Sequence, residues 1–237
     1  WRPLNVQKIN PGHFGQCASE PVVHIKKVLN VISVYLQRNS SEMKKGNSQV
    51  STQYNCRFVR GNHDALCLDY LKYGKAPELW VLHGGQSSID AYKHCSSEQI
   101  TQHIEFLDQL ENYIESDMKL FVHAGFSHPK GPSEEFHAHM VYWDRSLWET
   151  ARAAHVLNDK DSWQYPERLK LYKEIYIGHT PVQRIGASTP FCASNVWNVD
   201  TGAAFQGSLS MINTETKAFW QSDPLPSLYP NELGRQA

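Results

Sequence analysis

The chain has 237 residues, which is enough for one sizeable core, and we expect a single domain over residues 1–237. Its hydrophobic content of 41% and charged content of 20% are typical of a globular protein and exclude a disordered chain. The formal net charge of -1, without long blocks of like charge, gives no reason to expect a nucleic-acid partner. No apolar run approaches the roughly 18 residues that span a bilayer, so no membrane association is expected either.

The five cysteines are scattered along the chain, and none belongs to a Cys-x-x-Cys pair. This pattern argues against a zinc ribbon or a disulfide framework and fits a reducing compartment. We therefore expect a cytoplasmic location.

The first half of the chain gives uneven signals. Residues 1–20 show no periodicity and form an atypical segment, whereas apolar side chains recur at helical spacing after Pro21. The elements predicted in this half are a helix over 21–36, a polar loop over 39–51, a buried strand over 56–59, and a short helix over 67–73 that is closed by Gly74.

The second half carries clearer patterns. Ser96-x-x-Gln99 has the spacing of a capping box and is followed by one apolar helical face that extends to Ile114. The other predicted elements are strands over 119–122, 174–177, 196–199, 209–212 and 217–220, helices over 146–157 and 166–173, a hairpin turn over 213–216, and an extended tail over 223–237. Strand–helix units followed by antiparallel strands predict a mixed α/β domain whose sheet is covered by helices.

Three of the predicted strands end in a polar, metal-competent residue beside glycine. Asn62 follows Gly61, His123 precedes Ala124-Gly125, and His179 follows Gly178. Parallel or mixed strands bring such loops together at one edge of a sheet, and glycine lets the backbone approach a shared centre. Two imidazoles and an amide oxygen suit Mn, Fe or Zn better than Ca or Mg. Taken singly, each of these residues also fits an ordinary polar turn or a core position.

Together these segments resemble successive signatures of the calcineurin-like metallophosphoesterases, most closely the branch of the serine/threonine protein phosphatases and their diadenosine-tetraphosphatase relatives. The match extends over roughly residues 54–222. The segments that carry it are Arg60-Gly61-Asn62-His63-Asp64, Phe121-Val122-His123-Ala124-Gly125, Gly178-His179-Thr180-Pro181 and Val199-Asp200-Thr201-Gly202.

The resemblance implies an α/β fold with a β-sandwich flanked by helices, and a phosphatase acting through metal-activated water. It makes Asn62, His123 and His179 ligands of the second of two metal ions, manganese, iron or zinc. It makes His63 the general acid that protonates the leaving oxygen, with Asp64 as its polar support. Arg145 is a candidate phosphate clamp, although a surface salt bridge fits that position equally well.

The family's first two signatures, Asp-x-His-Gly and Gly-Asp-x-x-Asp, are absent from the chain. No aspartate precedes Asn62, and neither His13 nor Glu20 is an acceptable substitute. We therefore expect at most one ion per chain, bound weakly. Three explanations remain open: the chain is a fragment, it has an altered amino terminus, or it is a degenerate relative. In the family the missing amino-terminal strands lie centrally in the sheet, so their loss is expected to leave an exposed hydrophobic sheet edge.

The functional prediction is a phosphomonoester hydrolase acting on a phosphorylated protein or a small phosphoester. Two alternatives stay open: a dinucleoside polyphosphate hydrolase, such as one acting on diadenosine tetraphosphate, and an inactive phosphoesterase fold that serves as a binding module. Three further features have ordinary structural interpretations, namely a Gly-Gly turn at 83–85, a solvated loop carrying His137 and His139, and a small aromatic core at Tyr142, Trp143 and Trp148.

Overall fold

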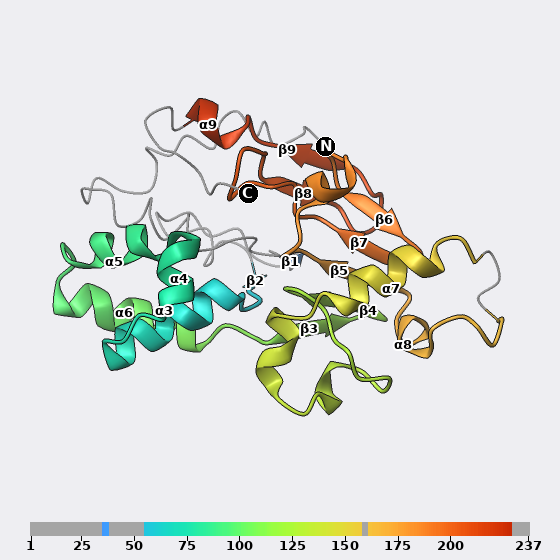
Figure 1. Cartoon of the computed structure of the whole chain (residues 1–237), viewed down its shortest axis with the longest axis horizontal. Coiled ribbons are helices and arrows are strands. Elements are labelled where there is room, and N and C mark those ends of the chain that lie inside the picture. The colour runs from blue at the N-terminus through green and yellow to red at the C-terminus, as the bar shows by residue number, and fades with distance from the viewer. Residues whose placement is uncertain (1–34, 38–54, 158–160, 229–237) are drawn as a thin grey trace.

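The computed structural model, which describes residues 35–37, 55–157 and 161–228, is built around a five-stranded mixed sheet (Figure 1). The strands lie in the order β3 (Tyr113–Ser116), β4 (Lys119–Val122), β5 (Glu174–Ile177), β7 (Val196–Asn198) and β6 (Phe191–Ala193). Strands β4, β5 and β7 are parallel, and β3 and β6 run antiparallel to them at the two edges. The carboxyl ends of the three parallel strands therefore meet at one edge of the sheet.

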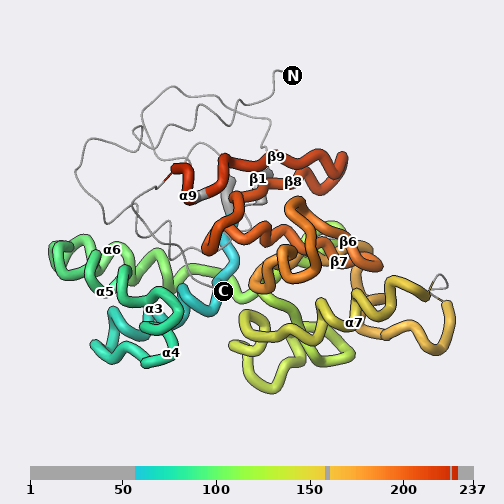
Figure 2. The backbone as a smooth tube through the Cα atoms, turned by 45° about the horizontal axis from the view of Figure 1, so that its top comes forward, coloured from blue at the N-terminus to red at the C-terminus, as the bar shows by residue number. Residues whose placement is uncertain are grey.

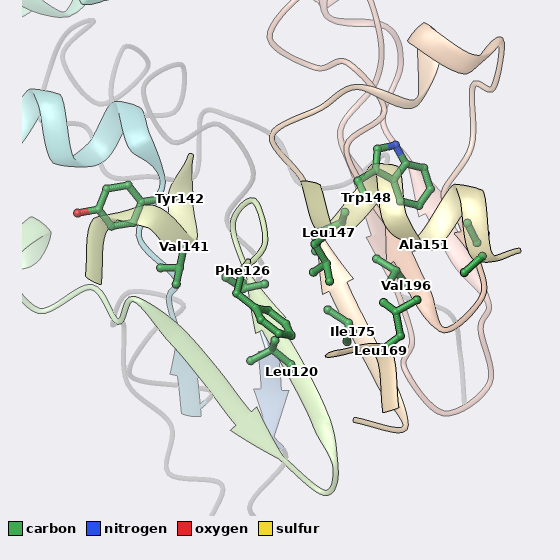
Figure 3. Packing of buried hydrophobic residues seen from close by; sticks show 14 of the residues in the cluster. Leu120, Phe126, Val141, Tyr142, Leu147, Trp148, Ala151, Leu169, Ile175 and Val196 are labelled. Carbon is green, nitrogen blue, oxygen red and sulfur yellow. The ribbon is translucent and has the colours of Figure 1, made fainter. Parts of the chain in front are cut away.

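One face of this sheet is covered by α7 (Ser146–Ala154) and α8 (Glu167–Lys170). Because strand side chains alternate between faces, Leu120 and Val122 of β4 point to the same side as Ile175 of β5. They pack against Leu147 and Ala151 of α7 in the largest buried apolar cluster, which Figure 3 shows. This cluster fixes α7 over the strands.

The opposite face carries the alternate residues. The rings of Phe121 and Tyr176 stack with centroids 5.0 Å apart, and Ile212 packs against this cluster from β8 (Ser210–Ile212). Strand β8 pairs with β9 (Phe219–Gln221) in a two-stranded antiparallel sheet. The predicted mixed α/β class with helices beside the sheet is confirmed, and in the described residues the layer opposite α7 is this hairpin.

A group of helices with its own core lies beside the sheet (Figures 1 and 2). Its members are α3 (Asn62–Tyr73), α4 (Glu78–Trp80), the π-helical turn η3 (Val81–Gly85), α5 (Gln86–Tyr92) and α6 (Ser97–Asp108). Its buried apolar residues include Cys67, Trp80 and Leu107. Most of helix α3 is therefore held by a core separate from that of the sheet, while Ala65 in its first turn packs against the sheet cluster.

The smaller elements complete the description. They are β1 (Tyr35–Gln37), which pairs antiparallel with β2 (Asn55–Arg57), the 3-10 turns η4 (Pro132–Glu134), η5 (Ala138–Tyr142) and η6 (Val182–Ile185), and the short helix α9 (Leu225–Leu228). In the part of the chain that the structure describes, no helix combines the length and the apolar character needed to cross a bilayer.

Several predicted features are confirmed. Ser96 and Gln99 form the capping box of α6, with Ser96 N–H donating to Gln99 Oε1 at 2.9 Å and Gln99 N–H donating to Ser96 Oγ at 3.2 Å. Gly74 ends α3 in the left-handed conformation, with φ of 69°. The predicted strands at 119–122 and 174–177 match β4 and β5, and the turn at 213–216 connects β8 to β9.

Other predictions were wrong at their boundaries. The helix expected over 67–73 begins at Asn62, because Gly61 is extended and its N–H donates to Asp64 in the first turn. The helix behind Ser96 ends at Asp108, and Ile114 belongs to β3 instead. The hairpin between β3 and β4 was missed because Asp117 and Met118 both adopt positive φ without glycine, which the turn more often contains.

The predicted amino-terminal helix is also corrected where the structure describes it. Residues 35–37 form β1 rather than the end of a helix over 21–36. The rest of that helix, the atypical segment 1–20 and the loop 39–51 lie outside the described residues, as do residues 229–237 of the tail. The described part of the tail contains α9 and is not simply extended.

Lys217 holds the β8–β9 hairpin to the main sheet. Its Nζ atom lies 2.5 Å from Glu174 Oε1 and donates to the Tyr176 hydroxyl at 2.8 Å, and it sits over the Tyr176 and Trp197 rings. Burial alone would raise the pKa of Glu174, but hydrogen bonds from Lys217 and Tyr176 outweigh it and hold that pKa below its usual value. Glu174 is therefore ionised and paired near neutral pH.

We predict that Lys217→Met lowers the free energy of unfolding by about 1–2 kcal/mol at pH 7, through the lost ion pair and cation–π contacts. Because the pKa of Glu174 is depressed in the fold, the ion pair stabilises above the ordinary glutamate pKa of about 4.3 and is lost as pH falls through the lower folded value. Urea unfolding at pH 7 and in acid measures this difference. Lys170→Met, which removes an exposed pair with Glu167, is the control and should cost less than about 0.5 kcal/mol.

Candidate functional site

Asn62, His123 and His179 come together at the edge where the parallel strands end. Asn62 is the first residue of α3, His123 directly follows β4, and His179 lies just beyond β5. Asn62 Oδ1 lies 3.0 Å from His123 Nε2, and the rings of His123 and His179 have centroids 5.1 Å apart. The structure thus places side by side the three residues that the sequence selected as metal ligands.

The two histidines are neighbours because their strands are. Adjacent strands in a sheet lie about 4.8 Å apart, which is close to the separation of the His123 and His179 rings. Gly178 N–H donates to His123 O at 2.8 Å and continues the pairing of β4 and β5 past their ends. His179 itself adopts φ of 65°, a left-handed conformation that costs a non-glycine residue roughly 1–2 kcal/mol. The surrounding turn must hold the residue in this conformation.

Gly61 lets α3 start close against His123. A Cβ atom at this position would lie 3.0 Å from both Cε1 and Nδ1 of His123 and 3.1 Å from Asp64 Oδ2. The φ of Gly61 is -96°, so the backbone conformation does not demand glycine. Glycine is needed because the backbone approaches His123 closely, and a side chain at position 61 would separate Asn62 from His123.

His63 and Asp64 occupy the rest of this first turn, and both are buried. Asp64 Oδ2 accepts the N–H of Gly61 at 2.7 Å and caps α3. Burial raises the pKa of Asp64 to about 7, against the lowering effects of the Gly61 N–H and the Arg60 charge. The side chain expected to support His63 is therefore one that fixes the start of the helix.

Arg60 holds the same segment from the other side. Its Nη2 atom donates to the carbonyls of Leu107 and Asp108, both at 3.0 Å, at the end of α6. Its backbone N–H donates to Glu111 O at 2.7 Å. Arg60 thus anchors the residues before α3 to the helical group.

The donor set is compatible with one metal ion. In an octahedral site, neighbouring ligands bonded at about 2.1 Å lie at right angles and about 3.0 Å apart, which is the separation of Asn62 Oδ1 and His123 Nε2. The distance between these two atoms is therefore the same whether they share a hydrogen bond or bind one metal ion as neighbouring ligands. Within the described ranges, no group of three or more His, Cys, Asp or Glu side chains could hold a metal ion. The candidate site consists of two imidazoles and an amide oxygen.

Arg145 is exposed at the start of α7, two residues beyond Trp143. The preceding residue, Asp144, caps α7 by accepting the N–H of Leu147 at 2.9 Å and the Ser146 hydroxyl at 2.7 Å. The link between this segment and the candidate ligands is Trp143, whose ring packs against His179.

Two residues near the site were not predicted. Trp143, which the sequence suggested as core, is exposed, and its ring packs edge-to-face on His179 with centroids 6.1 Å apart. Asn198, the last residue of β7, is fully buried and donates to Thr180 O at 2.8 Å, directly after His179. The same signal that marks the ligands, a polar residue at a strand end, could have found Asn198. His137 and His139 are exposed and stacked on each other, as a solvated loop allows.

No family model matches the chain, and no curated protein matches it. A solved structure assigned provisionally as a diadenosine tetraphosphatase aligns with a TM-score of 0.43 and 17% identity, covering 73% of this chain and 70% of that one. A cold-active protein-tyrosine phosphatase from a psychrophilic Shewanella species aligns with a TM-score of 0.36 and 14% identity, covering 70% of this chain and 58% of that one. The chain is thus distantly and partially similar in structure to these phosphoesterases.

We predict that Gly61→Ala weakens metal binding at this site roughly tenfold or more, because the added methyl group displaces His123. The same change should lower the free energy of unfolding by about 1–3 kcal/mol through overpacking. Calorimetric titration with Mn²⁺ and urea unfolding measure the two effects.

Gly74→Ala is the matched control at the other end of α3. A Cβ atom there meets nothing within 4 Å, but φ is 69°, so this variant should lose about 1 kcal/mol of stability and leave metal affinity unchanged. Equal metal affinity in wild type and Gly61→Ala would contradict the role assigned to the glycine.

Proposed function

We propose that this chain is a metal-dependent phosphoesterase acting on phosphomonoesters, in which Asn62, His123 and His179 bind one divalent ion, manganese, iron or zinc. The observation that supports this most strongly is the 3.0 Å approach of Asn62 Oδ1 to His123 Nε2, from elements far apart in the sequence. The ordered motifs of the sequence support the same reaction. When bound, the ion supplies Lewis-acid polarisation of a phosphoryl oxygen.

The residues of α3 then act on the substrate. The first intrahelical hydrogen bond of α3 runs from Ala65 N–H to Gly61 O at 3.1 Å. The backbone N–H groups before Ala65 in the first turn therefore have no acceptor within the helix. They form the positive end of the helix dipole and favour an anionic phosphoryl group. His63, which is adjacent to Asn62 and buried in this turn, is the proposed general acid that gives a proton to the leaving oxygen. Asp64 keeps the turn in position by capping it.

Arg145 is the proposed phosphate clamp. Its planar guanidinium group can donate two parallel hydrogen bonds to a phosphoryl group. Its exposure leaves it accessible to substrate, and Trp143 ties its segment to His179. The substrate is proposed to be a phosphorylated protein or a small phosphoester. Hydrolysis rates measured with a phosphopeptide and with diadenosine tetraphosphate distinguish a protein phosphatase from a dinucleoside polyphosphate hydrolase.

We predict that hydrolysis of p-nitrophenyl phosphate with added Mn²⁺ falls roughly 10²–10⁴-fold in His63→Asn, since the proton donor is lost while the fold is kept. His94→Asn, which changes an exposed histidine after α5, should retain the wild-type rate. Release of p-nitrophenol, followed by absorbance, measures both variants.

The same assay is applied to a longer version of the chain that carries Asp-x-His-Gly and Gly-Asp-x-x-Asp upstream of residue 54. Turnover only in the longer version would show that these two motifs supply catalytic groups that the present chain lacks. The absence of turnover in both versions would contradict the enzyme proposal.

A further inference from the structure

Asn198 has a buried side chain that the proposed reaction does not use. It is the last residue of β7, is 0% exposed, and lies opposite Ile177 in the pairing of β5 with β7. It shares a sheet face with Val196, which lies in the apolar cluster under α7. A buried amide on an apolar face costs free energy unless its hydrogen-bonding groups are satisfied.

Both ends of this amide are hydrogen-bonded, one to the turn that carries His179 and the other to the backbone just beyond β7. Asn198 Nδ2 donates to Thr180 O at 2.8 Å, and Asn198 Oδ1 accepts the N–H of Asp200 at 3.0 Å. Asp200 O in turn accepts the N–H of Val182 at 2.9 Å. The side chain of Asn198 thus connects Thr180 to the end of β7, and the Asp200 carbonyl that follows connects Val182 to it.

His179 needs such support because its backbone is strained. Its φ of 65° is in the left-handed region, and the neighbouring Thr180 N–H donates to Gly178 O at 2.7 Å in a tight turn. Strained residues persist where the surrounding structure determines their conformation. The hydrogen bond to Thr180 O holds the Thr180–Pro181 peptide group, one residue beyond the strained His179.

We propose that Asn198 is a positioning residue for His179: it holds the turn in the conformation that directs the imidazole toward Asn62 and His123. This inference rests on the proposed function, because it assigns His179 to the metal ligands. Residues that orient a metal ligand without binding the metal themselves typically lower the metal affinity roughly 10–100-fold when they are mutated.

The chain offers a matched control in Asn195, at the opposite end of β7. This asparagine is also buried, and its Nδ2 atom donates to Leu169 O and Tyr172 O, each at 2.8 Å. Asn195→Asp and Asn198→Asp make the same isosteric change and remove the same kind of hydrogen bond. They differ in that the bonds of Asn195 lie at the amino end of the strand, away from His179.

The first readout is the set of imidazole signals of His179 in histidine side-chain NMR spectra, recorded without metal at one pH and assigned by comparison with His179→Gln. We expect Asn198→Asp to shift these signals and Asn195→Asp to leave them in place, although both variants lower the unfolding temperature. Unchanged His179 signals in folded Asn198→Asp, or equal shifts in both variants, would overturn the proposal. If either aspartate variant does not fold, Asn198→Ser and Asn195→Ser replace the pair, with the same expected contrast.

The second readout is the dissociation constant for Mn²⁺ from calorimetric titration. Asn198→Asp should bind Mn²⁺ roughly 10–100-fold more weakly than wild type, and Asn195→Asp within about twofold of it. Equal affinity in wild type and Asn198→Asp would contradict the positioning role. A wild-type protein that binds no Mn²⁺ would overturn the proposed metal site, whereas the His179 signals would still decide what Asn198 does to the turn.

Discussion

The parallel pairing of β4, β5 and β7 is the constraint on which the candidate site depends. Parallel neighbours end at the same edge of a sheet, about 4.8 Å apart, so the residues that follow them meet whatever their separation in the sequence. His123, His179 and Asn198 all lie at this edge, and Asn62 reaches it from the start of α3. Three elements supply a possible ligand set because the sheet fixes where two of them end and the helical group fixes the third.

The site is held by polar groups buried against an apolar core. The cluster under α7 excludes water from one face of the sheet, and Asn198 is buried on that face. Asp64 caps α3 through Gly61, and burial shifts its pKa to about 7, so this carboxyl group is far less readily ionised than an exposed one. The local free-energy cost of burying these groups is offset by hydrogen bonds that fix the geometry of the turns. The conformation of the turns at the strand ends thus depends on the hydrogen bonds of these buried side chains.

The sequence predicts the apolar strands β4 and β5 and the histidines that follow them, because short buried strands before glycine have few alternatives. The sequence also predicts that Asn62 lies near these histidines, but it assigns Asn62 to a turn instead of a helix. The reason is that Gly61, the extended residue before α3, has no side chain to mark a helix start. The β3–β4 hairpin is hidden because Asp117 and Met118 adopt positive φ without glycine or asparagine. Trp143 could not be assigned to the site from its residue type, since packing alone decides whether a tryptophan is core. Asn198 could have been found by its place at a strand end, but the turn that its side chain binds is decided by packing.

The central claim, that Asn62, His123 and His179 bind one divalent ion, is tested most directly by electron spin echo measurements on the Mn²⁺-loaded protein, combined with elemental analysis. The account predicts at most one ion per chain, with modulation from two imidazole nitrogens that falls to one in His179→Gln. Two tightly held ions per chain, or a bound ion without coupling to imidazole nitrogen, would contradict it.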